Sequence, residues 1–153
     1  MPVVEPGSRP TYTSPVERAL RIGSTVLLAV AVAQAGFGSG LGASLIARPK
    51  SEVLEAMHQG NAWLVVLVAV VCTAVGARLR QQGGPAWPLV FAASLAGAAV
   101  LQAALGELRV VGPHLFLGVL FLCAVTTFCS YAWRYAPRPA AASVAPGSSS
   151  PGS

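Results

Sequence analysis

The sequence Ser51-Glu-Val-Leu-Glu-Ala-Met-His-Gln-Gly-Asn-Ala-Trp63 runs without a break into Leu64-Val-Val-Leu-Val-Ala-Val-Val-Cys-Thr-Ala-Val-Gly-Ala77, and this stretch decides the fold. Its first residue suits a helix N-cap, so a helix is predicted over 52–78. At 1.5 Å per residue this helix is about 39 Å long, whereas the hydrocarbon core of a bilayer is about 30 Å thick. We therefore predict a membrane-crossing helix whose first two turns, which carry Glu55 and His58, lie at or above the membrane surface.

Three further apolar runs, at 22–40, 85–106 and 113–135, are also long enough to cross a membrane. The first of them exceeds the roughly 7–15 apolar residues of a signal-peptide core, so a retained helix is predicted there. The chain is 54% hydrophobic and only 10% charged, whereas soluble proteins carry about 25% charged residues. The sequence thus predicts an all-α protein, an integral membrane four-helix bundle within residues 20–136.

The second half of the first run is rich in glycine, with Gly36, Gly38, Gly40 and, just beyond it, Gly42. Two interpretations remain open for it. Small residues at four-residue spacing let helices approach closely, and glycine also marks the place where a helix gives way to a loop. A loop is predicted over 41–50.

The two ends of the chain are rich in proline and polar residues. They are predicted to be a disordered leader at 1–19 and a disordered tail at 137–153. The net charge of +5 comes without basic clustering, which argues against nucleic acid as a partner. The three cysteines all fall within apolar runs and are predicted to be buried packing residues: Cys72, Cys123 and Cys129.

Basic residues predict the orientation in the membrane. The ends and the middle loop share one side of a four-helix protein and hold seven basic residues: Arg9, Arg18, Arg21, Arg78, Arg80, Arg134 and Arg138. The other side holds three: Arg48, Lys50 and Arg109. Because positive charge favours the cytoplasmic side, both termini are predicted to be cytoplasmic in a bacterial-type cytoplasmic membrane.

An internal repeat relates the first and third runs. Ala31 to Gly38 and Ala99 to Gly106 agree at five of eight positions. The most informative matches are the glycine at the end of each copy and the glutamines Gln34 and Gln102, since polar residues are rare in membrane spans. The repeat predicts two helix hairpins related by a pseudo-twofold axis along the membrane normal.

Under this symmetry His58 and His114, the only histidines of the chain, become equivalent residues at the same depth. Two facing imidazoles in an apolar four-helix bundle suit a heme. The alternative is that each is an interfacial polar residue. A structural zinc site is disfavoured, because no third ligand accompanies the pair. Gln34 and Gln102 either bond between helices or bond to groups of a bound ligand.

The chain resembles the heme A synthase family, whose members contain two similar four-helix bundles, each with a pair of histidines on its second and fourth helices. This sequence is similar to one such half. The resemblance spans most of Thr25 to Trp133 and is carried by Gln34 to Gly42, Glu55 to His58, Gln102 to Gly106 with Val110, and Pro113-His114.

The resemblance implies an oxidoreductase of heme A maturation for cytochrome oxidase, which hydroxylates a methyl group of heme O. It also implies heme b bound by His58 and His114, and a catalytic role for Glu55, which shares a helical face with His58. Glu55 as a solvated residue of a first helical turn is the alternative.

The chain departs from the family in three ways. Gln59 stands where the family has arginine, the segment 41–57 lacks the cysteine pair of many bacterial members, and one bundle is present instead of two. Activity would then require a homodimer or a partner bundle, or contact with heme-biosynthesis or cytochrome oxidase assembly proteins. The second hypothesis is a non-catalytic membrane protein, either a heme-binding electron-transfer subunit or an assembly or interaction subunit.

Overall fold

The computed structural model describes residues 14–47 and 51–135, the side chains of 43–47 excepted. It contains α1 (Pro15–Ala47), α2 (Glu52–Gln81), α3 (Trp87–Glu107) and α4 (Val111–Arg134), and no strand occurs within the described ranges. Each helix is long and apolar enough to cross a membrane, α1 over Pro15–Gly42. The predicted all-α, four-helix membrane bundle is confirmed.

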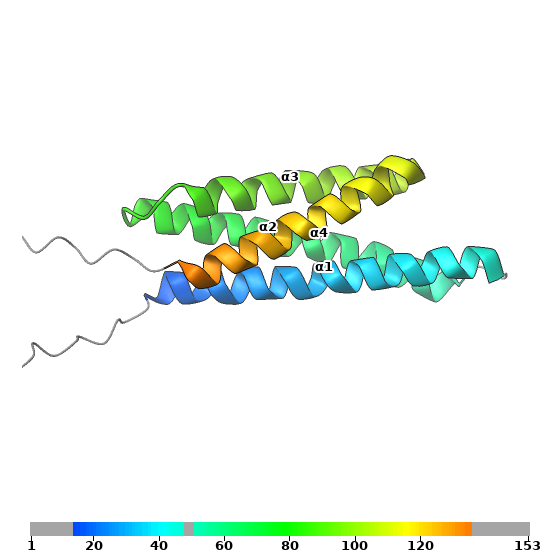
Figure 1. Cartoon of the computed structure of the whole chain (residues 1–153), viewed down its shortest axis with the longest axis horizontal. Coiled ribbons are helices and arrows are strands. Elements are labelled where there is room, and N and C mark those ends of the chain that lie inside the picture. Colours follow the sequence, from blue (N-terminus) through cyan, green and yellow to red (C-terminus); the bar gives the residue numbers. More distant parts are fainter. Residues whose placement is uncertain (1–13, 48–50, 136–153) are drawn as a thin grey trace, which may run out of the picture.

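The four helices form two hairpins that pack side by side (Figure 1). Helix α2 packs against α1 and α3, and α4 packs against the same two helices. Within the described residues the diagonal pairs, α1 with α3 and α2 with α4, have no close backbone approach. The start of α1 and the end of α4 meet at one end of the bundle, where the Arg21 guanidinium donates to the Tyr135 carbonyl at 3.0 Å.

Apolar side chains cover the outside of the bundle. Leu67 is 58% exposed, Phe116 66% and Val119 65%. In water such extended apolar surface is unfavourable, whereas a bilayer solvates it. The outer surface of this multi-pass protein is therefore suited to contact with lipid.

The start of α1 differs from the prediction. The helix begins at Pro15 rather than residue 22, so 15–19 is not a disordered leader. The physical reason is a capping box: the backbone N–H of Glu17 donates to the Ser14 hydroxyl at 3.2 Å, and the backbone N–H of Ser14 donates to the Glu17 carboxylate at 3.1 Å. Residues 1–13 lie outside the described part of the chain.

The glycine-rich segment of α1 is helical, so the loop predicted over 41–50 is wrong for 41–47. The other helices begin and end within about three residues of the predicted bounds. The predicted N-cap of α2 is confirmed, since the Ser51 hydroxyl accepts from the backbone N–H of Leu54 at 3.3 Å. The predicted tail at 137–153 lies outside the described residues.

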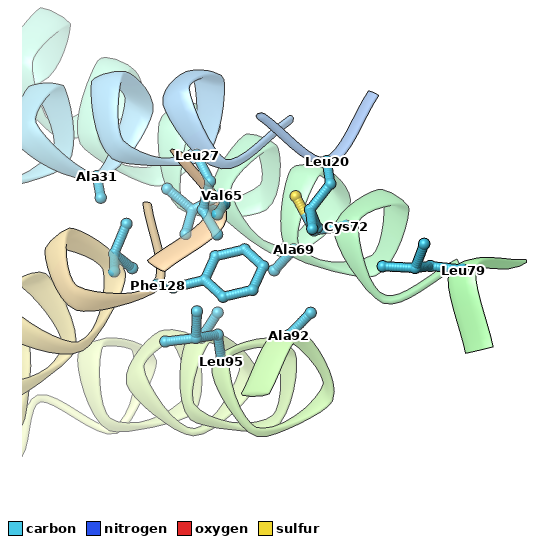
Figure 2. Packing of buried hydrophobic residues seen from close by; sticks show 13 residues of the cluster. Leu20, Leu27, Ala31, Val65, Ala69, Cys72, Leu79, Ala92, Leu95 and Phe128 are labelled. Carbon is cyan, nitrogen blue, oxygen red and sulfur yellow. The ribbon is translucent and has the colours of Figure 1, made fainter. Parts of the chain in front are cut away.

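The core is centred on Phe128 of α4, which is fully buried. Figure 2 shows its ring between Leu95 of α3 and the side chains of α1 and α2, among them Leu27 and Val65. Cys72 and Cys129 are buried as predicted, but Cys123 is exposed, because it lies on the outward face of α4. This core lies toward the end of the bundle that holds the described termini, and it fixes the helices that carry the histidines at the other end.

Replacement of Ser14 by alanine is expected to destabilise the fold by about 1 kcal/mol, because it removes the side-chain acceptor of the capping box. The measurement is the midpoint of unfolding in detergent, followed by circular dichroism. Ser94→Ala is the control, since that hydroxyl bonds only the Val90 carbonyl of its own helix. Equal midpoints for Ser14→Ala and Ser94→Ala would show that the capping box does not stabilise α1.

Candidate functional site

The two histidines meet at the end of the bundle opposite the described termini. His58 lies in the second turn of α2 and His114 in the first turn of α4. Their ring centres are 6.2 Å apart and their planes are inclined by 76°. Because α2 and α4 occupy one diagonal of the bundle, the two imidazoles approach the bundle axis from opposite sides, as the internal repeat predicted.

A glycine of the neighbouring helix makes room for each ring. A Cβ atom on Gly38 would lie 3.1 Å from Cε1 of His58, and one on Gly106 would lie 3.3 Å from Cε1 of His114. These glycines are the last residues of the two repeat copies. The repeat therefore encodes a shared local structure, in which a glycine on the first helix of each hairpin receives a histidine from the second.

The two glutamines of the repeat also contact the histidines, and both bond between adjacent helices. The Gln34 amide nitrogen lies 3.3 Å from Nε2 of His58. The Gln102 amide donates to the backbone carbonyl of His114 at 3.1 Å, and Nδ1 of His114 donates to the backbone carbonyl of Gln102 at 3.1 Å. The bonds differ in kind, since Gln34 reaches a ring nitrogen through its side chain whereas Gln102 does so through its backbone.

Asn61 belongs to the site although the sequence analysis did not select it. Its amide nitrogen donates to the Val30 carbonyl at 2.9 Å and to Oε1 of Gln34 at 2.8 Å. The available signal was its spacing, because Asn61 follows His58 by three residues and so lies on the same helical face. A polar residue at that position, directly before an apolar run, is a candidate for bonding between membrane helices.

Two buried side-chain atoms within the described part of the chain have no hydrogen-bond partner, and both belong to this site. They are Nδ1 of His58 and Oε1 of Gln102. An unsatisfied buried polar group costs about 1–3 kcal/mol, and such groups often mark functional positions. Within the described residues, buried side-chain atoms without a hydrogen-bond partner therefore occur at the end of the bundle that contains the histidines.

The other predicted residue, Glu55, lies on α2 one turn before His58 and is half-buried. It thus shares the face of α2 that carries the imidazole. Gln59 stands where the heme A synthase family has arginine. Its side chain contacts α3 rather than the histidine pair, since its amide donates to the Glu107 carboxylate at 2.8 Å.

A heme would require fewer ligands from the chain than a bare metal ion would. The two ring centres, 6.2 Å apart, are near enough for both imidazoles to contact one bound group. No group of three or more His, Cys, Asp or Glu side chains able to hold a metal occurs in the described ranges. Two protein ligands are too few for a structural zinc, but they suffice for iron that a porphyrin already holds by four nitrogens.

An apolar groove of about 250 Å³ adjoins the site between α3 and α4. It is lined by Phe91, Ser94, Leu95, Ala98, Leu101, Gln102, Leu117, Leu120, Phe121 and Ala124. Its volume lies just below the range of about 300–1,000 Å³ of small-molecule sites. The groove is therefore suited to a hydrocarbon chain rather than to a whole macrocycle.

No protein-family model, curated protein or solved structure matches the chain.

Proposed function

We propose that this membrane protein binds heme b through His58 and His114. The observation that carries the proposal is the pairing of the two imidazoles across the bundle diagonal, with ring centres 6.2 Å apart. Oε1 of Gln102, a buried polar atom of the same site that has no hydrogen-bond partner in the described residues, supports it. Bound heme would supply redox chemistry, and the chain would supply two imidazoles, an apolar surround and the polar groups that orient the ligands.

The resemblance to heme A synthases extends the proposal to heme A maturation, with heme O as substrate. In that role Glu55 would hold or release protons beside His58, because both lie on one face of α2. One histidine pair provides one heme position, so a second bundle is required to hold substrate and cofactor together. A homodimer, or a partner from heme biosynthesis or cytochrome oxidase assembly, would provide it.

A non-catalytic heme protein, such as an electron-transfer or assembly subunit, is the second candidate. The observation that favours it is that the chain has a single histidine pair, with no group of three metal-ligating side chains in the described ranges. One axially ligated heme suffices for electron transfer, whereas the maturation reaction needs a second heme as substrate.

The distribution of arginines between the two ends of the bundle bears on which side of the membrane the histidine pair lies. Several arginines lie at the bundle end that holds the described termini: Arg18, Arg21, Arg78, Arg80 and Arg134. By the positive-inside rule, these charges support a cytoplasmic location for that end in a bacterial-type membrane. The histidine pair would then lie near the outer surface.

Absorption spectroscopy tests heme binding. Protein expressed with adequate heme and purified in detergent is expected to show a Soret band that shifts on reduction. Single replacement of His58 or His114 by alanine should alter this spectrum. A wild-type protein that lacks a Soret band under these conditions would contradict both heme hypotheses.

Co-expression with a source of heme O distinguishes a heme A maturation enzyme from a non-catalytic electron-transfer or assembly subunit. Extraction of the pigments is expected to yield heme A or the hydroxylated intermediate if the protein is catalytic, and Glu55→Gln should then reduce the product. Unchanged heme O alongside a heme-loaded protein would support the electron-transfer or assembly role.

A further inference from the structure

The two imidazoles are presented differently by their hydrogen bonds. Nδ1 of His114 lies 3.1 Å from the backbone carbonyl of Gln102. A carbonyl only accepts, so Nδ1 carries the proton, and Nε2 of the neutral ring keeps its lone pair. Metal-binding histidines typically show this arrangement, in which the second nitrogen donates to a backbone carbonyl or carboxylate. His114 is therefore already oriented as a ligand.

His58 has the same tautomer, but its lone pair is engaged. The Asn61 atom that contacts the Val30 carbonyl must be the amide nitrogen, because a carbonyl only accepts. The same nitrogen contacts Gln34, which must face it with Oε1. The amide nitrogen of Gln34 is then the atom that lies 3.3 Å from Nε2 of His58, to which it donates. Asn61 thus orients the side-chain amide of Gln34 so that its N–H group donates to the Nε2 lone pair of His58.

The second nitrogen of His58 offers no easy alternative. Nδ1 is buried and has no partner, and it lies 3.4 Å from the position that a Cβ on Gly38 would take. A ligand approaching from that side would meet the backbone of α1. For His58 to bind iron, Nε2 must first lose the Gln34 bond, whereas no such bond to Nε2 of His114 occurs among the residues that the structure describes.

We infer that His114 would hold the iron permanently and His58 exchangeably, because the amide of Gln34 competes with the iron for the Nε2 lone pair of His58. This inference rests on the proposed heme binding and deepens it. Gln34 and Asn61 are positioning residues, since they act through His58. A small external ligand would then replace His58 at the iron while His114 retains the heme.

Hemin titration of the heme-free protein compares the two histidines. His114→Gly is expected to lower the affinity for hemin by about tenfold or more, and His58→Gly by less than about threefold. Added imidazole should restore hemin binding to His114→Gly, which shows that this variant is folded. Equal losses, a larger loss for His58→Gly, or no restoration by imidazole would overturn the inference.

Carbon monoxide binding to the reduced heme protein tests Gln34 and Asn61. Gln34→Leu and Asn61→Leu release Nε2 of His58 to the iron, so the affinity for carbon monoxide should fall by about threefold or more. Gln59→Leu is the matched control, because it lies beside His58 but bonds Glu107. Carbon monoxide affinities equal to wild type in both Gln34→Leu and Asn61→Leu would overturn the role of the amide.

The outcomes separate the two levels of the proposal. A wild-type protein that binds no hemin overturns heme binding and this inference together. A wild-type protein that binds hemin with equal dependence on the two histidines overturns this inference alone.

Nuclear magnetic resonance tests the tautomers in the heme-free protein. At about pH 8.5, well above the ordinary histidine pKa of about 6.5, ¹⁵N spectra of the two histidine rings should show both as Nδ1–H tautomers. An Nε2–H tautomer for His58 would contradict the hydrogen-bond chain.

Discussion

Replacement of Gly106 by valine is expected to lower heme affinity about 10–100-fold, a loss typical of disturbing the groups that orient a metal ligand. A Cβ added at this position would lie 3.3 Å from Cε1 and 3.6 Å from Nδ1 of His114. A side chain branched at Cβ cannot turn both methyl groups away from the ring. The imidazole must move, which disrupts its bond to the Gln102 carbonyl. The measurement is a hemin titration of the purified protein.

Gly97→Val is the matched control, because Gly97 lies on the same helix and a Cβ there would meet nothing within 4 Å. It carries the same helix-propensity cost, so any difference between the two variants reports the contact with the ring. Gly38→Val displaces the His58 ring in the same way, with Gly36→Val as its control, and should lower hemin affinity by less than about threefold because His58 is the exchangeable ligand. Equal hemin affinities for Gly106→Val and Gly97→Val would show that the glycine does not determine the position of His114.

Replacement of Gly76 by alanine is expected to reduce the free energy of unfolding by about 1–3 kcal/mol, as overpacking does. The new methyl group would lie 2.8 Å from the Cα and N atoms of Leu89 and 3.0 Å from the carbonyl carbon of Pro88. Backbone atoms at the start of α3 cannot move aside as a flexible side chain can. The α2–α3 contact must therefore open, and denaturant titration in mixed micelles measures the loss.

Gly60→Ala is the control for this change. Gly60 lies on the same helix and has open space at its Cβ position, so alanine should stabilise the helix by up to about 1 kcal/mol. The two substitutions add the same methyl group to one helix and are expected to act in opposite directions. A Gly76→Ala protein as stable as Gly60→Ala would show that α2 and α3 are not in the close contact described.

The sequence is sufficient to predict the four spans, because apolar runs of this length have few alternatives to a membrane helix. It also predicts the N-cap at Ser51 and the encounter of His58 with His114, since a repeat implies equivalent positions. The start of α1 differs from the prediction because the capping sequence Ser14 to Glu17 begins a helix directly after the proline-rich residues. Glycines 36–42 remain helical because, in a membrane span, the backbone must satisfy its own hydrogen bonds.

The details of the site could not be predicted. Which nitrogen of His58 is engaged depends on the side-chain rotamers of Gln34 and Asn61, and these follow from the packing of α1 against α2. The repeat even suggests that Gln34 and Gln102 are equivalent, yet one bonds a ring nitrogen through its amide and the other through its backbone. Sequence symmetry fixes position along the helices but not the choice among hydrogen-bond partners.

The most direct test of the account is the amount of heme bound per chain, measured by spectroscopic titration of wild-type protein and of His58→Ala/His114→Ala. The account predicts saturable binding near one heme per chain for wild type and almost none for the double variant. Circular dichroism of the double variant should show unchanged helix content, because the core around Phe128 lies away from the histidines. Wild-type protein that fails to bind heme, or a folded double variant that binds as much as wild type, would contradict it.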